Sequence, residues 1–175
     1  MIQNDFIKSL LNDYSSTFDV YAPHSLCGRE YAAYCYFTSR GERFVLIKRA
    51  VIWAAETNEH VLIINAGSFG AAAAGEFEAM FPKLEAELVK PHREHMYSYI
   101  TIIAVCSDVA PTVSKIIKKT RFCKNYKLTL HGYCAGRLAV ADLSSGNVYA
   151  NAAGKPLLPY LKKKMKIISD LKRGA

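Results

Sequence analysis

Residues 59–90 have the sequence EHVLIINAGSFGAAAAGEFEAMFPKLEAELVK, which contains a change of hydrophobic period. The first part is a short apolar run rich in β-branched residues, which predicts a strand. After Gly67, apolar side chains recur at helical spacing, so we expect a helix to about Lys90. Pro82 lacks an amide hydrogen and should kink or split that helix near Phe81. Strand and helix follow one another here, and the flanking segments decide how the strands pair.

Upstream of this stretch, the sequence predicts one helix and a series of short strands. Apolar residues at helical spacing indicate a helix that ends near Tyr14. The next part, from Arg29 to Asn65, has the aromatic and β-branched residues of an antiparallel meander. Its expected strands are Arg29–Phe37, Phe44–Lys48, Ala50–Ala55 and Glu59–Asn65, with turns at Ser39–Gly41 and at Thr57–Asn58.

Downstream of residue 90, strands and helices continue to alternate. Ser107 or Asp108 is expected to cap a helix that ends near Thr120. A hairpin turn is expected at residues 144–147. The remaining predictions are strands Tyr97–Cys106, Lys127–His131, Arg137–Ala141 and Val148–Ala150, and a basic helix Leu157–Leu171. We therefore predict a single α+β domain over residues 1–175, with a largely antiparallel sheet and helices packed on it.

The composition limits the class of protein. The chain has 175 residues, of which 51% are hydrophobic, but no apolar run approaches the roughly 20 residues of a membrane-spanning helix. No secretory signal is expected, so the predicted location is cytoplasmic, without a membrane span. The apolar excess predicts a homo-oligomer, with a two-fold dimer as the first expectation. The aromatic segment Arg29–Phe37 is its expected interface.

The five cysteines favour a reduced protein without a metal site. Their number is odd, and no pair has the spacing of a zinc ligand pair, so we expect neither a disulfide framework nor a stoichiometric transition metal. No cofactor is predicted either. The cysteines are Cys27, Cys35, Cys106, Cys123 and Cys134.

The charge is unevenly distributed along the chain. Residues 1–110 have nine Lys and Arg against thirteen Asp and Glu, whereas residues 111–175 have fourteen against two. This asymmetry indicates contact with nucleic acid, an acidic protein or another polyanion, although a solvated helix face is the simpler alternative. No aromatic-interleaved groove for single strands is evident. The candidate nucleic-acid-binding residues are Lys115, Lys118, Lys119, Arg121, Lys124, Lys127, Lys162, Lys163, Lys164 and Lys166.

Three short motifs with a catalytic or ligand-binding pattern are incomplete. Gly70 and Gly75 have the spacing of a phosphate-binding loop, but the positions of its lysine and hydroxyl hold Glu76 and Phe77. The His92–His95 segment lacks the four-residue separation of metalloprotease ligands. A nucleophile and base pair of Cys134 with His131 needs a turn between them, since residues three apart on a strand face opposite sides. Catalytic residues are therefore unassigned.

The order of helix, three strands, helix and strand over residues 1–106 resembles the core of restriction-endonuclease-like nucleases. The resemblance implies a divalent metal held by an acid on the second strand and a Glu-x-Lys on the third. Glu42 stands at the start of the second strand, but the third contains Glu59-His60-Val61 and no lysine. The resemblance therefore concerns the order of elements and does not imply nuclease activity.

Two functional classes follow. The first is a non-enzymatic binding or assembly module whose basic last third contacts nucleic acid or another polyanion. The alternative is a small enzyme or ligand-binding domain, which includes a degenerate nuclease-like fold, whose site is assembled from residues distant in sequence. The sequence leaves open whether the protein is an enzyme.

Overall fold

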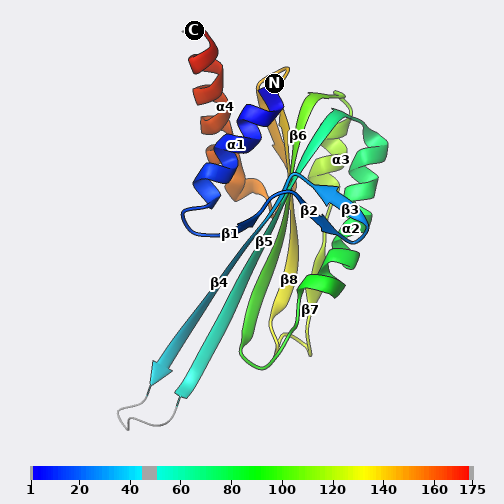
Figure 1. The fold of residues 1–175 in the computed structure, drawn as a ribbon. Coiled ribbons are helices and arrows are strands. Elements are labelled where there is room, and N and C mark those ends of the chain that lie inside the picture. Colours follow the sequence, from blue (N-terminus) through cyan, green and yellow to red (C-terminus); the bar gives the residue numbers. More distant parts are fainter. Residues whose placement is uncertain (1, 45–50, 174–175) are drawn as a thin grey trace.

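A computed structural model describes residues 2–44 and 51–173, and it contains a mixed β-sheet with helices on both faces (Figure 1). The helices are α1 (Ile2–Tyr14), α2 (Ala71–Leu88), α3 (Val113–Lys119) and α4 (Leu158–Arg173), with a short 3-10 helix η1 (Lys155–Leu157) before α4. The strands are β1 (Asp19–Tyr21), β2 (His24–Leu26), β3 (Arg29–Tyr31), β4 (Ala33–Phe44), β5 (Val51–Phe69), β6 (His95–Val109), β7 (Cys123–Asn125), β8 (Tyr133–Asp142) and β9 (Asn147–Ala150).

The sheet is mixed: most of its strand pairs are antiparallel, as expected, but the pairs at its centre are parallel, which the sequence did not predict. The strand order is β1-β4-β5-β6-β8-β7, and β9 also pairs with β8. β5 pairs with β6, and β6 with β8, in parallel. Parallel neighbours need a crossover connection, and α2 and α3 provide these two connections. The antiparallel pairs are those of β1 with β4, β4 with β5, β7 with β8, and β9 with β8, which is consistent with the α+β class.

Each face of the sheet carries a hydrophobic core. α2 and α3 cover one face, the α2–α3 face, and α1 and α4 cover the other, the α1–α4 face (Figure 1). Because successive strand residues point to opposite faces, Leu62 and Ile64 pack under α2 while Val61 and Ile63 pack under α1. Two cores bury much of the apolar excess. The fully buried large side chains include Phe6, Leu10, Phe69, Phe77, Phe81, Leu84, Ile100, Ile102 and Ile103.

Several predicted elements are confirmed. α1 ends at Tyr14, β6 contains the predicted strand, and α4 coincides with the basic helix. The hairpin turn at residues 144–147 connects β8 to β9. α2 contains Pro82 as one uninterrupted helical segment, so the prediction of a split is wrong.

Other local predictions are wrong. No turn forms at Ser39–Gly41 or at Thr57–Asn58, because β4 and β5 continue through both sites as paired strands. Ser107 and Asp108 belong to β6 and do not cap α3. The predicted strand Lys127–His131 is a turn. Most of the predicted strand Phe44–Lys48 lies outside the described residues.

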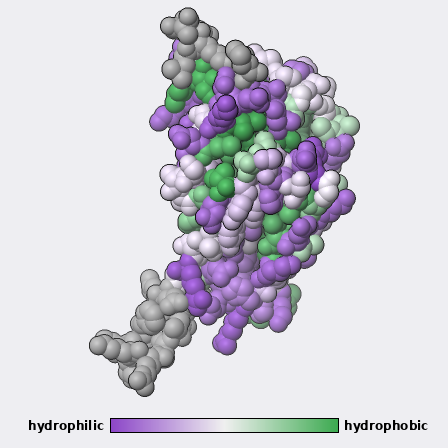
Figure 2. Space-filling model, in the orientation of Figure 1, coloured by the Kyte–Doolittle hydropathy of each residue, from purple (hydrophilic) through white to green (hydrophobic). Residues whose placement is uncertain are grey.

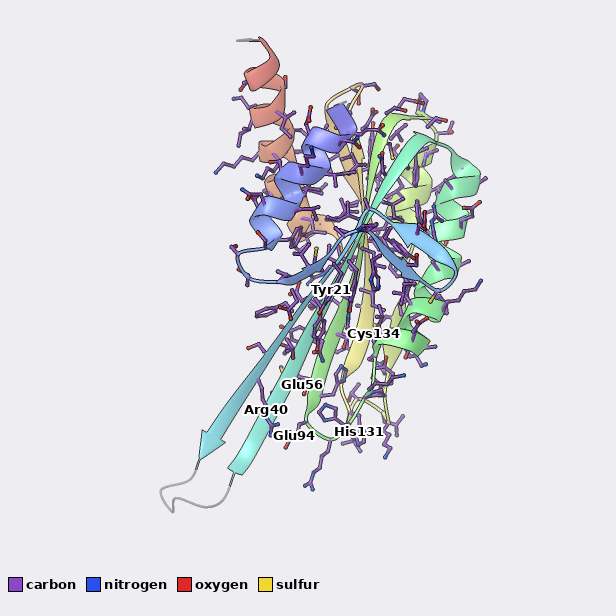
Figure 3. The ribbon with its side chains drawn as sticks, viewed as in Figure 1. Tyr21, Arg40, Glu56, Glu94, His131 and Cys134 are labelled. Carbon is purple, nitrogen blue, oxygen red and sulfur yellow. The ribbon has the colours of Figure 1, made fainter. Side chains whose placement is uncertain are left out.

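The lower end of the molecule in Figure 1 is formed by the starts of β5, β6 and β8. β4 and β5 extend there beyond the neighbouring strands. Figure 2 shows hydrophilic residues over this end on the visible face. Arg40 forms an ion pair of 2.9 Å with Glu94 across this end (Figure 3). Among the described helices, none has the length and apolar character needed to cross a membrane.

Candidate nucleic-acid interface

The basic last third of the chain forms one edge of the sheet. β7 and β9 both pair with β8, and α3 and α4 pack against β9 from opposite faces. Lysines that are far apart in sequence therefore surround the same edge. We call this surface the basic edge, and its exposed cations are Lys115, Lys118, Lys119, Arg121, Lys127, Lys162, Lys163 and Lys166.

Asn151 joins the elements that carry these cations. Its side chain is 1% exposed. Its Oδ1 accepts hydrogen bonds from the backbone N–H groups of Leu138 at 3.0 Å and Gly154 at 2.8 Å. Its Nδ2 donates to the carbonyls of Gly136 at 2.9 Å and Thr120 at 3.3 Å. One amide thus fixes the end of α3, the strand β8 and the start of η1 relative to one another.

Two of the predicted binding cations are engaged within the protein. Lys164, 15% exposed, donates to Asp13 at 2.8 Å and to the Ser9 hydroxyl at 2.8 Å. The hydrogen bond from Lys164 lowers the pKa of Asp13. Lys124 lies 2.7 Å from the carboxylate of Glu85, which is itself 6% exposed. Lys164 ties α4 to α1, and Lys124 ties β7 to α2.

The basic edge has little acidic compensation from its own third of the chain. Of the two acidic residues in positions 111–175, Asp142 is 3% exposed and Asp170 is exposed. Burial alone would raise the pKa of Asp142, but hydrogen bonds from the hydroxyl and N–H groups of Ser144 and Ser145 lower it. The Asp142 carboxylate therefore stabilises the β8–β9 turn through these hydrogen bonds and is not exposed at the basic edge.

A cleft of about 480 Å³ opens at the upper end of the basic edge, between α4 and the β8–β9 turn. Lys162 and Lys166 form one wall, and Ser144 and Ser145 form part of the other. The floor is apolar and includes Phe6 and Met165. Its two lysines belong to the candidate residues predicted from the sequence.

The lower half of the α1–α4 face carries a group of aromatic rings. Tyr97 and Tyr99 of β6 and Tyr133 of β8 are half-buried, whereas Ile103 and Ala139, farther along the same strands, are buried under the helices. The ring centroids of Tyr97 and Tyr99 are 4.8 Å apart, and those of Tyr97 and Tyr133 are 6.0 Å apart. The Tyr99 and Tyr133 hydroxyls lie 3.0 Å apart. We call these three tyrosines the aromatic face.

Arg137 lies beside the aromatic face, opposite Thr101 in the register, and has an incomplete set of partners. Its guanidinium carbon is 3.3 Å from the centroid of the Tyr99 ring, and its Nη1 is 3.5 Å from Glu59. The side chain is 15% exposed. Its Nε is buried and has no hydrogen-bond partner. A planar cation, a carboxylate and an aromatic ring are thus within contact distance of one another.

Further aromatic rings mark the upper margin of this surface, where α1 and α4 begin to cover the sheet. Tyr14 contacts Phe18 edge to face at 5.0 Å, and Phe18 lies 5.4 Å from Phe37. Tyr14, Phe18 and Tyr160 line a hollow of about 280 Å³. Burial raises the pKa of Tyr14 well above its usual range, and the charge of Glu59 contributes to the shift.

On the α2–α3 face, the side chains of His95, Ser98 and Cys134 are buried. The Nδ1 of His95 donates to the His131 carbonyl at 2.8 Å, so its Nε2 accepts from Ser98 at 2.8 Å. A hydroxyl that donates to a histidine has the arrangement of a nucleophile and its general base. Ser98 is 1% exposed and His95 is 3% exposed, so a substrate cannot reach this pair. Cys134 is fully buried, and burial raises its pKa to about 12. In the described ranges, no group of three or more His, Cys, Asp or Glu side chains is placed to hold a metal ion.

At the Glu-x-Lys positions of the nuclease resemblance, Glu59 and Val61 both lie on the α1–α4 face, and no lysine accompanies the acid. Glu59 faces Arg137 on the α1–α4 face, whereas His60 is stacked between Tyr34 and Tyr36 on the opposite face. The side chain of Glu42 lies outside the described residues. Glu59, the acid of β5 that faces the α1–α4 side, is thus paired with Arg137.

The sequence did not reveal the aromatic face. The only available signal was the alternation Tyr97-Ser98-Tyr99, which places two rings on one side of a strand. Tyr133 joins them because β8 is the parallel neighbour of β6, with Tyr97 opposite Tyr133 in the register. This neighbourhood follows from the crossover topology rather than from local pattern.

Comparison with known proteins gives one match. A family model described as "Domain of unknown function (DUF8052)" matches residues 2–163, which include every element from α1 to the first turn of α4. No curated protein and no solved structure matches the chain.

Proposed function

The chain belongs to the family described as a domain of unknown function (DUF8052), and we propose that it is a non-enzymatic module that binds nucleic acid through the basic edge. One observation carries this proposal: exposed cations from α3 and α4 surround the same sheet edge, next to β9. Lysine and arginine bind phosphates by charge and release counterions, whatever the sequence of bases.

The internal contacts of the basic edge support a rigid surface. Asn151 fixes α3 relative to the start of α4, and Lys164 fixes α4 to α1. Cations on a fixed framework lose less freedom on binding than cations on a flexible tail. We therefore expect phosphate contacts from both helices at once, with affinity that depends strongly on salt.

Fluorescence anisotropy with a labelled oligonucleotide at several salt concentrations tests the proposal. Each lost phosphate contact reduces the slope of log affinity against log salt by about 0.9 for a duplex and about 0.7 for a single strand, so Lys162→Gln with Lys166→Gln should reduce it by about 1.8 or about 1.4. Lys118→Gln with Lys119→Gln should act similarly. Lys83→Gln with Lys90→Gln is the matched control, because both lysines are exposed but lie in or beside α2.

Two results would contradict the proposal. One is the absence of binding at low salt. The other is an equal loss of affinity in the control pair and in the α4 pair, since this would assign the effect to net charge. Displacement of the oligonucleotide by polyglutamate at equal charge concentration would reassign the surface to an acidic protein.

The oligomeric state is a separate prediction. The expected interface Arg29–Phe37 contributes Tyr31, Ala33 and Cys35 to the interior, which leaves Tyr34 and Tyr36 for a contact. We expect a two-fold dimer, and light scattering coupled to size exclusion should then give twice the 19.5 kDa of the chain. A mass of one chain at all concentrations would contradict it.

A further inference from the structure

We propose that the aromatic face binds unpaired nucleobases, so that the ligand of the basic edge is single-stranded nucleic acid. This inference rests on the proposed function and adds the strandedness of the ligand. Proteins that bind single strands combine a cationic path for the backbone with aromatic rings on which the bases stack. Both parts occur here on neighbouring strands.

The position of the tyrosines supports stacking. They come from adjacent parallel strands, with Tyr97 opposite Tyr133 and Tyr99 opposite Ala135 in the register. The three rings contact one another, with centroids 4.8 to 6.3 Å apart, so they form one continuous aromatic surface. α1 and α4 pack on the upper half of the same face and leave these three rings half-buried. Accessible rings on a rigid sheet suit bases of any sequence, since every base has a π-face.

Arg137 and Glu59 add polar recognition at the border of the aromatic face, next to Tyr99. The guanidinium lies flat enough against Tyr99 to bring its carbon within 3.3 Å of the ring centroid. The charge of the guanidinium offsets that of Glu59. The edge of an unpaired base carries both donors and acceptors, which a guanidinium and a carboxylate can match. A phosphate would meet Glu59 unfavourably, so a base is the better occupant of this position.

β7 connects the aromatic face to the basic edge. Its residues Cys123 and Asn125 pair with Ala135 and Tyr133, so they border the aromatic face. Arg121 precedes β7 and Lys127 follows it, and both are exposed. A single-stranded nucleic acid whose bases stack on the tyrosines can therefore place its phosphates at these cations where it crosses β7. A duplex cannot do so, because its bases are already stacked and paired.

Binding of oligothymidine and of a duplex of the same length tests the inference. Tyr97→Leu and Tyr133→Leu should each weaken single-strand binding roughly tenfold to hundredfold, the usual value for one stacked base. Tyr97→Phe and Tyr133→Phe keep the ring and should bind as the parent does. Duplex binding should be unchanged in all four. Tyr21→Leu is the matched control, because Tyr21 is 49% exposed and stacks with Tyr34 on the other face.

A footprint on the unmodified chain gives an independent measurement. Cys123 borders the aromatic face, whereas Cys27 is exposed at the β2–β3 turn, where it donates to Glu87. Oligothymidine should protect Cys123 from a thiol reagent and leave the rate at Cys27 unchanged.

The outcomes separate the two proposals. The inference is overturned if salt-dependent binding prefers the duplex. It is also overturned if the leucine variants bind single strands as the parent does and Cys123 stays unprotected. Either result leaves the proposed function in place. Absence of binding by both ligands overturns both. Loss of single-strand binding in the leucine variants alone, with protection of Cys123, supports the inference.

Discussion

The guanidinium of Arg137 lies over the ring of Tyr99, with 3.3 Å between the guanidinium carbon and the ring centroid. The two residues come from β8 and β6, which are parallel neighbours. Glu59 of β5 contacts the same guanidinium at 3.5 Å. Three adjacent strands are thus linked on the half of the α1–α4 face that none of the described helices covers.

This contact should be measurable as a coupling free energy. Arg137→Met and Tyr99→Leu each remove it, and a partly desolvated cation–π pair contributes about 1–2 kcal/mol. We expect the double variant to be less destabilised than the sum of the single variants by this amount, as measured by urea unfolding. Additivity within about 0.3–0.5 kcal/mol would show that the contact contributes no stability.

Gly132 and Gly146 provide a matched pair for the cost of close packing. Their φ angles are +69° and +73°, so alanine is strained by a similar amount at both. A Cβ at Gly132 would approach the Met96 carbonyl oxygen, whereas a Cβ at Gly146 meets nothing within 4 Å. We expect Gly146→Ala to cost about 1 kcal/mol and Gly132→Ala several kcal/mol in the free energy of unfolding. Equal costs would contradict the close approach.

Asn151 should be among the least tolerant polar positions. Asn151→Ala leaves the Leu138 N–H and the Gly136 carbonyl without their partner in the interior, at about 1–3 kcal/mol for each group. Asn151→Asp should also destabilise, because a carboxylate cannot donate to the two carbonyls. Asn147→Ala, at an exposed position, is the control and should change the unfolding midpoint little. A similar midpoint for all three variants would contradict the role of Asn151.

His60 should make stability depend on pH in mildly acidic solution. Burial lowers its pKa from 6.5 to about 4, so between these values the unfolded chain binds a proton that the folded chain does not. The free energy of unfolding should therefore fall as the pH decreases from about 6.5 to about 4, by an amount on the order of 3 kcal/mol. His60→Phe removes this contribution, and its stability should fall less over the same range. Parallel pH profiles for the two proteins would contradict the prediction.

Elements with a clear hydrophobic period were predictable from the sequence. α1, α4 and β6 agree because their apolar spacing agrees with their burial. The turn predicted at Thr57–Asn58 was wrong, and it was predicted because Asn is common in turns. In the structure, Asn58 is 8% exposed, accepts from Tyr36 and donates to Glu56, so tertiary hydrogen bonds hold it within β5. The local turn propensity of Asn58 carries no information about these tertiary hydrogen-bond partners.

The candidate site was predictable in its charges but not in its shape. Counting lysines located the basic third of the chain, but it did not show that Lys164 and Lys124 are bound to Asp13 and Glu85. Parallel pairing of β6 with β8 joins Tyr97 to Tyr133, which lie 36 positions apart. Such pairing depends on how α3 crosses the sheet, and a local sequence pattern does not encode it.

The contact between Asp13 and Lys164 spans 151 positions of the chain, and it has a consequence for synthesis on the ribosome. α1 is translated before α4, so its apolar side lacks this helical neighbour until α4 has been translated. At roughly 5–20 residues per second, that interval lasts on the order of ten seconds. Phe6 and Leu10, both fully buried in the finished protein, remain unshielded by α4 for that time. The nascent chain therefore exposes the apolar side of α1 until α4 can pack against it.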